Sequence, residues 1–157
     1  MINKFDPKET TKLFGLQKEL NFLFNLYKKN KLPKVLLISG NRGTGKSTLI
    51  NHLIFSICDK DHYDFLHNSI SNQSNFYNMF TNDLATNIFF LSNSRTKVSI
   101  EDIRDLKNKL SKSSINNLEK FIILDDIDKL NLNCVNALLK IIEEPTKNNY
   151  FILIDNK

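Results

Sequence analysis

Short, continuously apolar segments alternate along the chain with longer segments in which apolar residues recur every three or four positions. Continuous apolar runs are typical of strands buried on both faces, and the wider spacing is typical of amphipathic helices. The predicted strands are residues 35–39, 88–91, 121–124 and 150–154, and the predicted helices cover about 16–29, 49–57, 100–110 and 135–142. This alternation predicts an α/β fold, a doubly wound parallel sheet with helices on both faces and right-handed crossovers.

Local signals mark the ends of two of these helices. Ser99 and Asp102 have the spacing of a capping box, with the shorter acid in place of Glu, at the start of the helix over 100–110. Asn131 or Asn133 is expected to cap the helix over 135–142, which should end before Pro145. Residues 59–87 are polar and rich in Asn, with only a weak helical pattern at Phe76, Phe80 and Leu84.

Composition narrows the class of protein. The length of 157 residues suits one domain, and 41% hydrophobic with 25% charged residues is close to globular averages. No run approaches the roughly 18 to 20 apolar residues that span a bilayer, and the polar N-terminus lacks a signal-peptide core. We therefore expect a cytoplasmic protein without a membrane partner. The net charge of +5 comes from lysines spread along the chain, which indicates a solvated surface rather than a basic patch.

Residues 40–47 match the phosphate-loop pattern G-x-x-x-x-G-K-[ST] in full, between a predicted buried strand and a predicted helix. Glycines let backbone N–H groups turn toward phosphate oxygens, and the positive end of the following helix favours the same anion. The Lys46 ammonium can reach the β- and γ-phosphates, and the Ser47 hydroxyl can ligate Mg²⁺. The pattern predicts ATP and Mg²⁺ as cofactors, bound by Gly40, Asn41, Arg42, Gly43, Thr44, Gly45, Lys46, Ser47 and Thr48.

An acidic pair follows the third predicted strand. Besides the Ser47 hydroxyl, a phosphate loop needs a second Mg²⁺ ligand, usually an Asp that ends a neighbouring strand, and Asp125 is the candidate. Asp126 stands where many ATPases place a catalytic Glu that polarises the attacking water, but its side chain is one methylene shorter. The alternative is that both residues only form a turn after the strand.

The segment N-A-L-L-K-I-I-E-E-P at 136–145 closely resembles the N-A-L-L-K-x-L-E-E-P signature of bacterial clamp-loader ATPases. Residues 125–131 and 99–106 resemble the delta-prime group of DNA polymerase III within that family, and the likeness covers nearly the whole chain. The resemblance implies an AAA+ fold with sheet order 5-1-4-3-2. It also implies that a polar residue at the end of the last strand approaches the γ-phosphate, and Asn156 is the candidate, with Asp155 as the alternative.

The same resemblance implies partners and a boundary. The expected partners are the gamma/tau and delta subunits, and through the complex the sliding clamp and primer–template DNA. Residues 1–157 would form a partial AAA+ nucleotide-binding domain that lacks the fifth strand, the lid, the arginine finger and the collar. Many relatives carry a four-cysteine zinc module after the loop helix, whereas residues 59–87 contain no Cys, and His62 and His67 alone make no zinc site.

Two other functions remain open from the sequence. A gamma/tau-type subunit would hydrolyse ATP as a motor, and it tends to carry Asp-Glu where this chain has Asp125 and Asp126. An unrelated phosphate-loop kinase for nucleotides should show an Arg-rich lid. The chain has three arginines in all, Arg42, Arg95 and Arg104, which disfavours the kinase.

Overall fold

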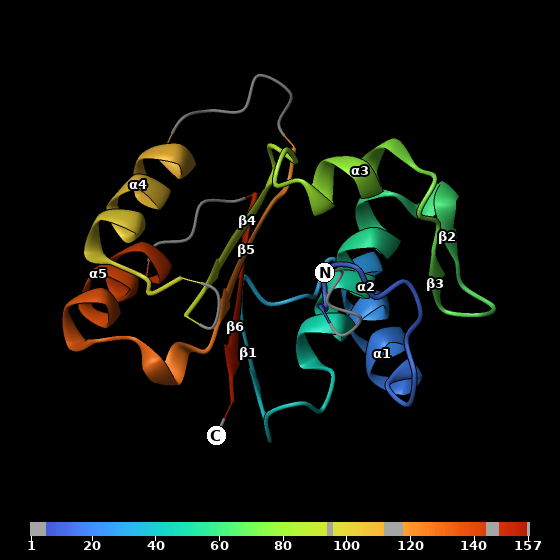
Figure 1. Ribbon diagram of the computed structural model, residues 1–157, viewed down its shortest axis with the longest axis horizontal. Coiled ribbons are helices and arrows are strands. Elements are labelled where there is room, and N and C mark those ends of the chain that lie inside the picture. Colours follow the sequence, from blue (N-terminus) through green and yellow to red (C-terminus); the bar gives the residue numbers. More distant parts are fainter. Residues whose placement is uncertain (1–5, 94–95, 112–117, 144–147, 157) are drawn as a thin grey trace. The chain divides into compact units, whose positions relative to one another are not determined.

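The computed structural model describes residues 6–93, 96–111, 118–143 and 148–156, and the chain forms two compact units (Figure 1). The sheet unit comprises residues 33–42 and 86–157. The helical unit comprises residues 1–32 and 43–85. The two units divide the predicted phosphate loop between Arg42 and Gly43, so each unit is described by itself.

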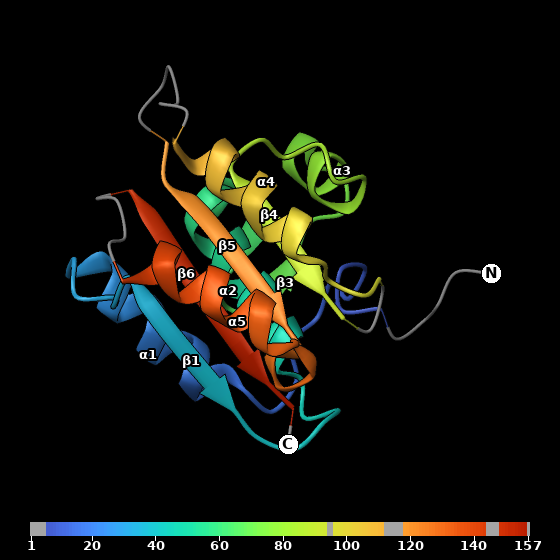
Figure 2. The ribbon, with the colours of Figure 1, turned by 90° about the vertical axis from the view of Figure 1, so that its left-hand side faces the viewer.

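The sheet unit is built on four parallel strands, shown edge-on in Figure 1 and more openly in Figure 2. They are β1 (Val35–Ser39), β4 (Ile88–Ser92), β5 (Lys120–Asp125) and β6 (Asn149–Asp155), in the order β1-β6-β5-β4. This order confirms the 1-4-3-2 part of the expected arrangement. Because all four strands run the same way, their carboxyl ends meet at one edge of the sheet.

Helices α4 (Ile100–Ser111) and α5 (Leu132–Ile142) pack together on one face of this sheet. The predicted capping box is present, since Asp102 accepts from the Ser99 N–H and Ser99 Oγ from the Asp102 N–H. Asn131 rather than Asn133 caps α5, by accepting from the Cys134 N–H at 2.9 Å. Pro145 lies outside the described residues. The core between helices and sheet consists of Val98, Ile103, Leu106, Leu110, Ile122, Leu124, Cys134, Leu138 and Phe151.

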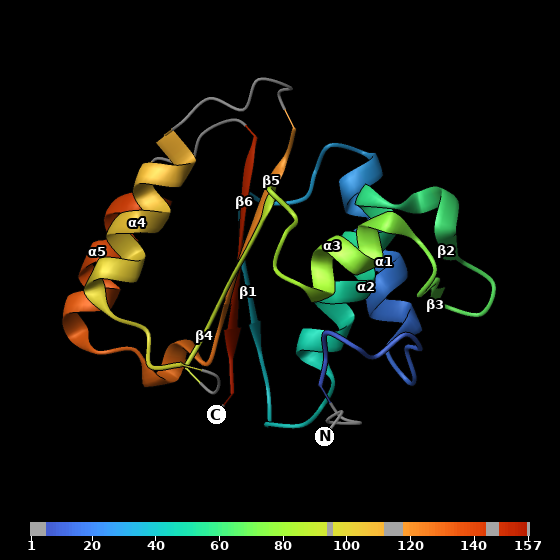
Figure 3. The same ribbon diagram turned by 45° about the horizontal axis from the view of Figure 1, so that its top comes forward.

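The helical unit contains α1 (Gln17–Lys28) packed against α2 (Lys46–Cys58), then a 3-10 turn η1 (Lys60–His62) and α3 (Asn75–Thr81) (Figure 3). The weak helical pattern is confirmed at Phe76 and Phe80, whose rings pack on the buried Phe55 ring. It does not extend to Leu84, which lies beyond α3 and is 65% exposed. No helix in the described ranges is both long and apolar enough to cross a membrane.

A small antiparallel hairpin in the helical unit was not predicted. It pairs β2 (Tyr63–Asp64) with β3 (Ser69–Ile70). The segment before α1 runs along β3, where the Leu13 N–H donates to the Asn68 carbonyl and the Ile70 N–H to the Thr11 carbonyl. Strands of two residues are too short to show an alternating pattern, which is why the sequence gives no signal for them.

Strand β1 is an open edge of the described sheet, because its partner within the described residues is β6 alone. Leu37, at the middle of β1, is 59% exposed. Exposed apolar edge strands promote pairing between molecules. We expect the mass measured by light scattering to rise with protein concentration, and the substitution Leu37→Lys to suppress this rise. Leu139→Lys, at an exposed leucine of α5, is the control and should not change it. A wild-type protein that stays monomeric at high concentration would contradict the prediction.

Candidate nucleotide-binding site

The phosphate-loop residues of the helical unit lead directly into α2, as predicted. Gly43 and Gly45 adopt φ of +84° and +85°, a region that side-chain-bearing residues rarely occupy. Apart from Gly43 and its two chain neighbours, no residue has a heavy atom within 4 Å of the position that a Cβ on Gly43 would take, which leaves room for a ligand at this backbone. Leu16 Cδ1 would lie 3.2 Å from a Cβ on Gly45. Both glycines are thus required by the loop's geometry.

Lys46 is the first residue of α2 and is 7% exposed, with its ammonium 3.4 Å from Thr44 Oγ1. Ser47 and Thr48 follow in the first turn and are half-buried. The helix contains 13 residues and has no acidic residue in its first turn. Its N-terminal end therefore keeps the partial positive charge that favours a phosphate. The donor set of ammonium, hydroxyl and backbone N–H groups fits a nucleotide phosphate with its Mg²⁺.

In the sheet unit, the loop starts where β1 ends, and the predicted acidic residues lie at the same edge. The register pairs Ser39 of β1 with Asp155 of β6, and Asp125 of β5 with Ile154 of β6. Gly40, Asn41 and Arg42 continue from Ser39, and Asn41 and Arg42 are exposed. Parallel strands thus bring the beginning of the loop and the Asp125 carboxylate to one edge of the unit.

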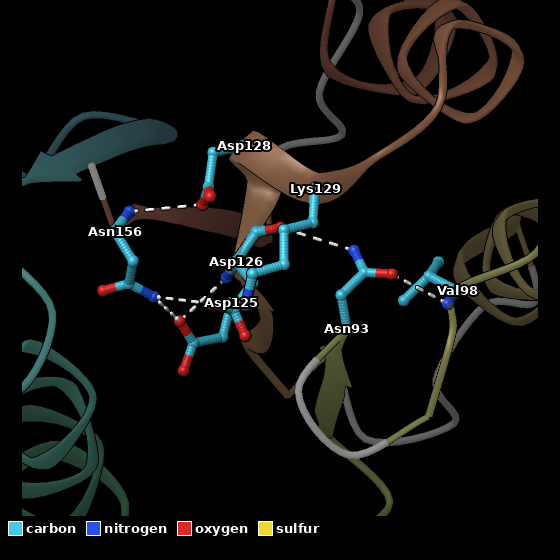
Figure 4. A network of polar contacts seen from close by, with 7 residues as sticks. All are labelled: Asn93, Val98, Asp125, Asp126, Asp128, Lys129 and Asn156. Carbon is cyan, nitrogen blue, oxygen red and sulfur yellow. Dashed lines mark hydrogen bonds and ion pairs between the residues drawn. The ribbon is translucent and has the colours of Figure 1, made fainter.

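Three predicted site residues are joined there by hydrogen bonds. The Asn156 amide Nδ2 donates to Asp125 Oδ1 at 2.8 Å and to Asp126 Oδ1 at 3.1 Å (Figure 4). Asp125 Oδ1 also accepts from the Asp126 backbone N–H at 2.8 Å. Asn156 therefore orients the proposed Mg²⁺ ligand directly, a contact across 31 residues of sequence.

Asp126 combines a strained backbone with a buried side chain. Its φ is +57°, in the left-handed region, and the residue is 1% exposed. The Lys129 ammonium donates to Asp126 Oδ1 at 2.9 Å, and the Asn93 amide donates to the Asp126 carbonyl at 3.3 Å (Figure 4). Asn93 and Lys129 were not predicted as part of the site. Lys129 lies in the 125–131 segment, to which the resemblance gave no role for this lysine, and the Asn93 contact spans 33 residues of sequence.

The other candidate groups lie outside this network. Arg104 forms an exposed ion pair with Glu101 on α4 at 3.7 Å, and Arg95 lies outside the described residues. His62 and His67 each pair with the aspartate three residues before them, Asp59 and Asp64. Among the described residues, no group of three or more His, Cys, Asp or Glu side chains could hold a metal ion.

A parallel sheet in the order β1-β6-β5-β4, with a phosphate loop after β1 and Asp125 ending β5, defines a phosphate-loop α/β protein. The particular family follows from the sequence comparison. Residues 15–157 match the family described as DNA polymerase III, delta subunit, and the chain belongs to this family. The match covers all the strands and the entire predicted site.

Individual relatives agree with this family. DNA polymerase III subunit delta' of Buchnera aphidicola subsp. Acyrthosiphon pisum is 32% identical over 90% of this chain and 43% of its own length. DNA polymerase III subunit tau/gamma of Haemophilus influenzae is 27% identical over 98% of this chain and 22% of its own length. The chain thus spans less than half the length of these relatives.

One of the solved structures that the comparison found is a DNA polymerase III gamma subunit-related protein from Thermotoga maritima. Its TM-score is 0.49 at 18% identity, and the match covers 87% of this chain and 39% of that chain.

Proposed function

We propose that the chain is a delta-prime-like subunit of a bacterial clamp loader, which binds ATP with Mg²⁺ and helps to load the sliding clamp on primed DNA during replication. The proposal is carried by one observation: a complete phosphate-loop sequence, in which Gly43 and Gly45 adopt positive φ, in a chain of the DNA polymerase III delta family. The gamma/tau and delta subunits would be its partners, and it would reach the sliding clamp and primer–template DNA through their complex. The location that fits this function is the cytoplasm.

Each site residue then has a role. The backbone N–H groups of the loop and the Lys46 ammonium bind phosphates, while Ser47 and Asp125 hold Mg²⁺, which shields phosphate charge. Asn156 orients Asp125 and approaches the γ-phosphate. Asp126 takes the position of the catalytic base, where its short and buried carboxylate favours slow hydrolysis. Delta-prime would then act mainly as a nucleotide-binding structural member of the ring.

The second candidate function is that of a gamma/tau-type subunit, which hydrolyses ATP as a motor. It is supported by the 27% identity to the tau/gamma relative over 98% of this chain. The Asp at position 126, where gamma/tau tends to carry Glu, favours the delta-prime assignment. A single-turnover ATPase assay in the presence of partner subunits separates the two, since a motor subunit would hydrolyse its bound ATP on assembly.

Two measurements test the proposal. Calorimetry should show one ATP bound per chain in the presence of Mg²⁺ and none with EDTA at the same nucleotide concentration. Size-exclusion chromatography with a bacterial tau/gamma subunit should show co-elution. Folded protein that binds no ATP would overturn the proposal, and failure to co-elute with the tau/gamma subunit would overturn its clamp-loader part.

A further inference from the structure

The Asp126 carboxylate is held by a lysine that no motif assigned. Asp126 Oδ1 accepts from Lys129 Nζ at 2.9 Å and from Asn156 Nδ2 at 3.1 Å (Figure 4). The Asp126 side chain is 2% exposed, whereas that of Lys129 is 40% exposed. The ion pair therefore places a solvent-reaching cation on a buried carboxylate.

The local backbone fixes this pair. Asp126 precedes the 3-10 turn η2 (Ile127–Lys129), and the Lys129 N–H donates to the Asp126 carbonyl at 3.0 Å. The left-handed φ of Asp126 and the Asn93 contact to the same carbonyl hold the turn in place. The turn thus places the Lys129 backbone one 3-10 turn from Asp126, where the lysine side chain can reach the Asp126 carboxylate.

This contact bears on hydrolysis. Hydrolysis of ATP forms a bond from a water oxygen to the γ-phosphorus and breaks the bond to the β–γ bridging oxygen. ADP and inorganic phosphate leave, and a base takes the water's proton. Each oxygen of a carboxylate offers about two acceptor positions. The Lys129 and Asn156 donors occupy those of Asp126 Oδ1 and fix the direction of the carboxylate, so an attacking water would have to reach Asp126 Oδ2 in that direction.

We propose that Lys129 is a positioning residue that holds the Asp126 carboxylate away from an attacking water and so restrains hydrolysis while leaving nucleotide binding intact. The proposal rests on the proposed function, because it assumes that ATP binds. It assigns the slow turnover to a residue of this chain, in addition to the missing methylene of Asp126. Releasing Lys129 should therefore speed hydrolysis at unchanged affinity.

The test uses the full 157-residue chain and four substitutions. Lys129→Met removes the cation at similar length, Lys129→Arg keeps it, and Lys107→Met on the exposed face of α4 is the matched control. The double variant Lys129→Met with Asp126→Asn asks whether Asp126 is the group released. Single-turnover ATP hydrolysis, ATP affinity by calorimetry and the urea midpoint of unfolding without nucleotide are measured for each.

We expect Lys129→Met to raise turnover at least fivefold, with ATP affinity within twofold of wild type. Lys129→Arg and Lys107→Met should match wild type within twofold, and the double variant should lose the gain. Without nucleotide, Lys129→Met should lower the urea midpoint of unfolding, because it leaves the buried Asp126 carboxylate without the Lys129 cation. The double variant should have a higher midpoint than Lys129→Met, because Asp126→Asn removes the buried charge. Should Lys129→Met fail to fold, Lys129→Gln takes its place with the same expectations.

Turnover of Lys129→Met within twofold of wild type, including no detectable turnover in either, would overturn this inference and leave the proposed function standing. A double variant as fast as Lys129→Met would also overturn it, because Asp126 would then not be the released group. Equal urea midpoints for wild type and Lys129→Met would show that the ion pair does not hold Asp126. Absence of ATP binding by folded wild-type protein would instead defeat the proposed function.

Discussion

Replacing Lys46 by Ala should weaken ATP binding at least tenfold. A charge-assisted contact to phosphate is about twice as strong as a neutral hydrogen bond, and a factor of ten in affinity corresponds to about 1.4 kcal/mol. Lys46 is 7% exposed at the start of α2, where its ammonium adds to the positive end of the helix. Calorimetric titration with ATP and Mg²⁺ measures the effect.

The control for this substitution is Lys31→Ala, which removes an exposed lysine after α1 from the same unit. It should leave the ATP affinity unchanged, so that any loss with Lys46→Ala cannot come from net charge. A urea unfolding curve at pH 7 checks that both variants are folded. Equal affinity in wild type and Lys46→Ala would mean that the loop does not bind phosphate through this lysine.

Lowering the pH from 7 to 4 should cost the protein about 3 kcal/mol of stability through His52 alone. His52 is fully buried on α2, with its Nδ1 3.0 Å from the Tyr63 hydroxyl. Burial lowers the pKa of His52 from 6.5 to about 4, partly opposed by a hydrogen bond with the Thr10 backbone. Because the unfolded chain takes up the proton more readily, this contribution is complete above pH 6.5 and is lost as the pH falls toward 4.

The measurement is the free energy of unfolding in urea at pH 7 and at pH 4.5. His52→Asn keeps a polar atom near the place of Nδ1 but has no group that titrates in this range, so its stability should fall less between the two values. His62→Asn is the control, since the His62 side chain is 58% exposed and should leave the wild-type pH dependence largely intact. The prediction fails if wild type and His52→Asn lose the same free energy on acidification.

Local features of this protein could be predicted because their causes lie within a few residues. The four apolar runs became β1, β4, β5 and β6, but the expected burial on both faces holds only for the central strands β5 and β6, because β1 and β4 lie at the edges of the described sheet. The capping box of Ser99 and Asp102 formed as expected, because both partners sit within one helical turn. Gly43 and Gly45 adopt positive φ because glycine has no Cβ, which is also a local cause.

The placement of His52 could not be predicted. Helix α2 buries polar residues as well as apolar ones, including Asn51, His52 and Ser56, so its pattern does not separate a buried face from an exposed one. The Asn51 amide Nδ2 donates to the Pro7 carbonyl at 2.8 Å, 44 residues away in sequence. No pattern along α2 indicates a partner so distant in the chain.

The sequence by itself determined the four strands of the parallel sheet, most of the helices, the phosphate loop and the family, because hydrophobic periodicity, glycine and a ten-residue signature act locally. Only the tertiary structure decided which polar groups meet at the edge of the sheet. Asn156 reaches Asp125 and Asp126 because β6 lies beside β5, and Asn93 reaches the Asp126 carbonyl because β4 lies on its other side. Lys129 is three residues from Asp126, yet their ion pair depends on a left-handed turn that long-range contacts hold in place.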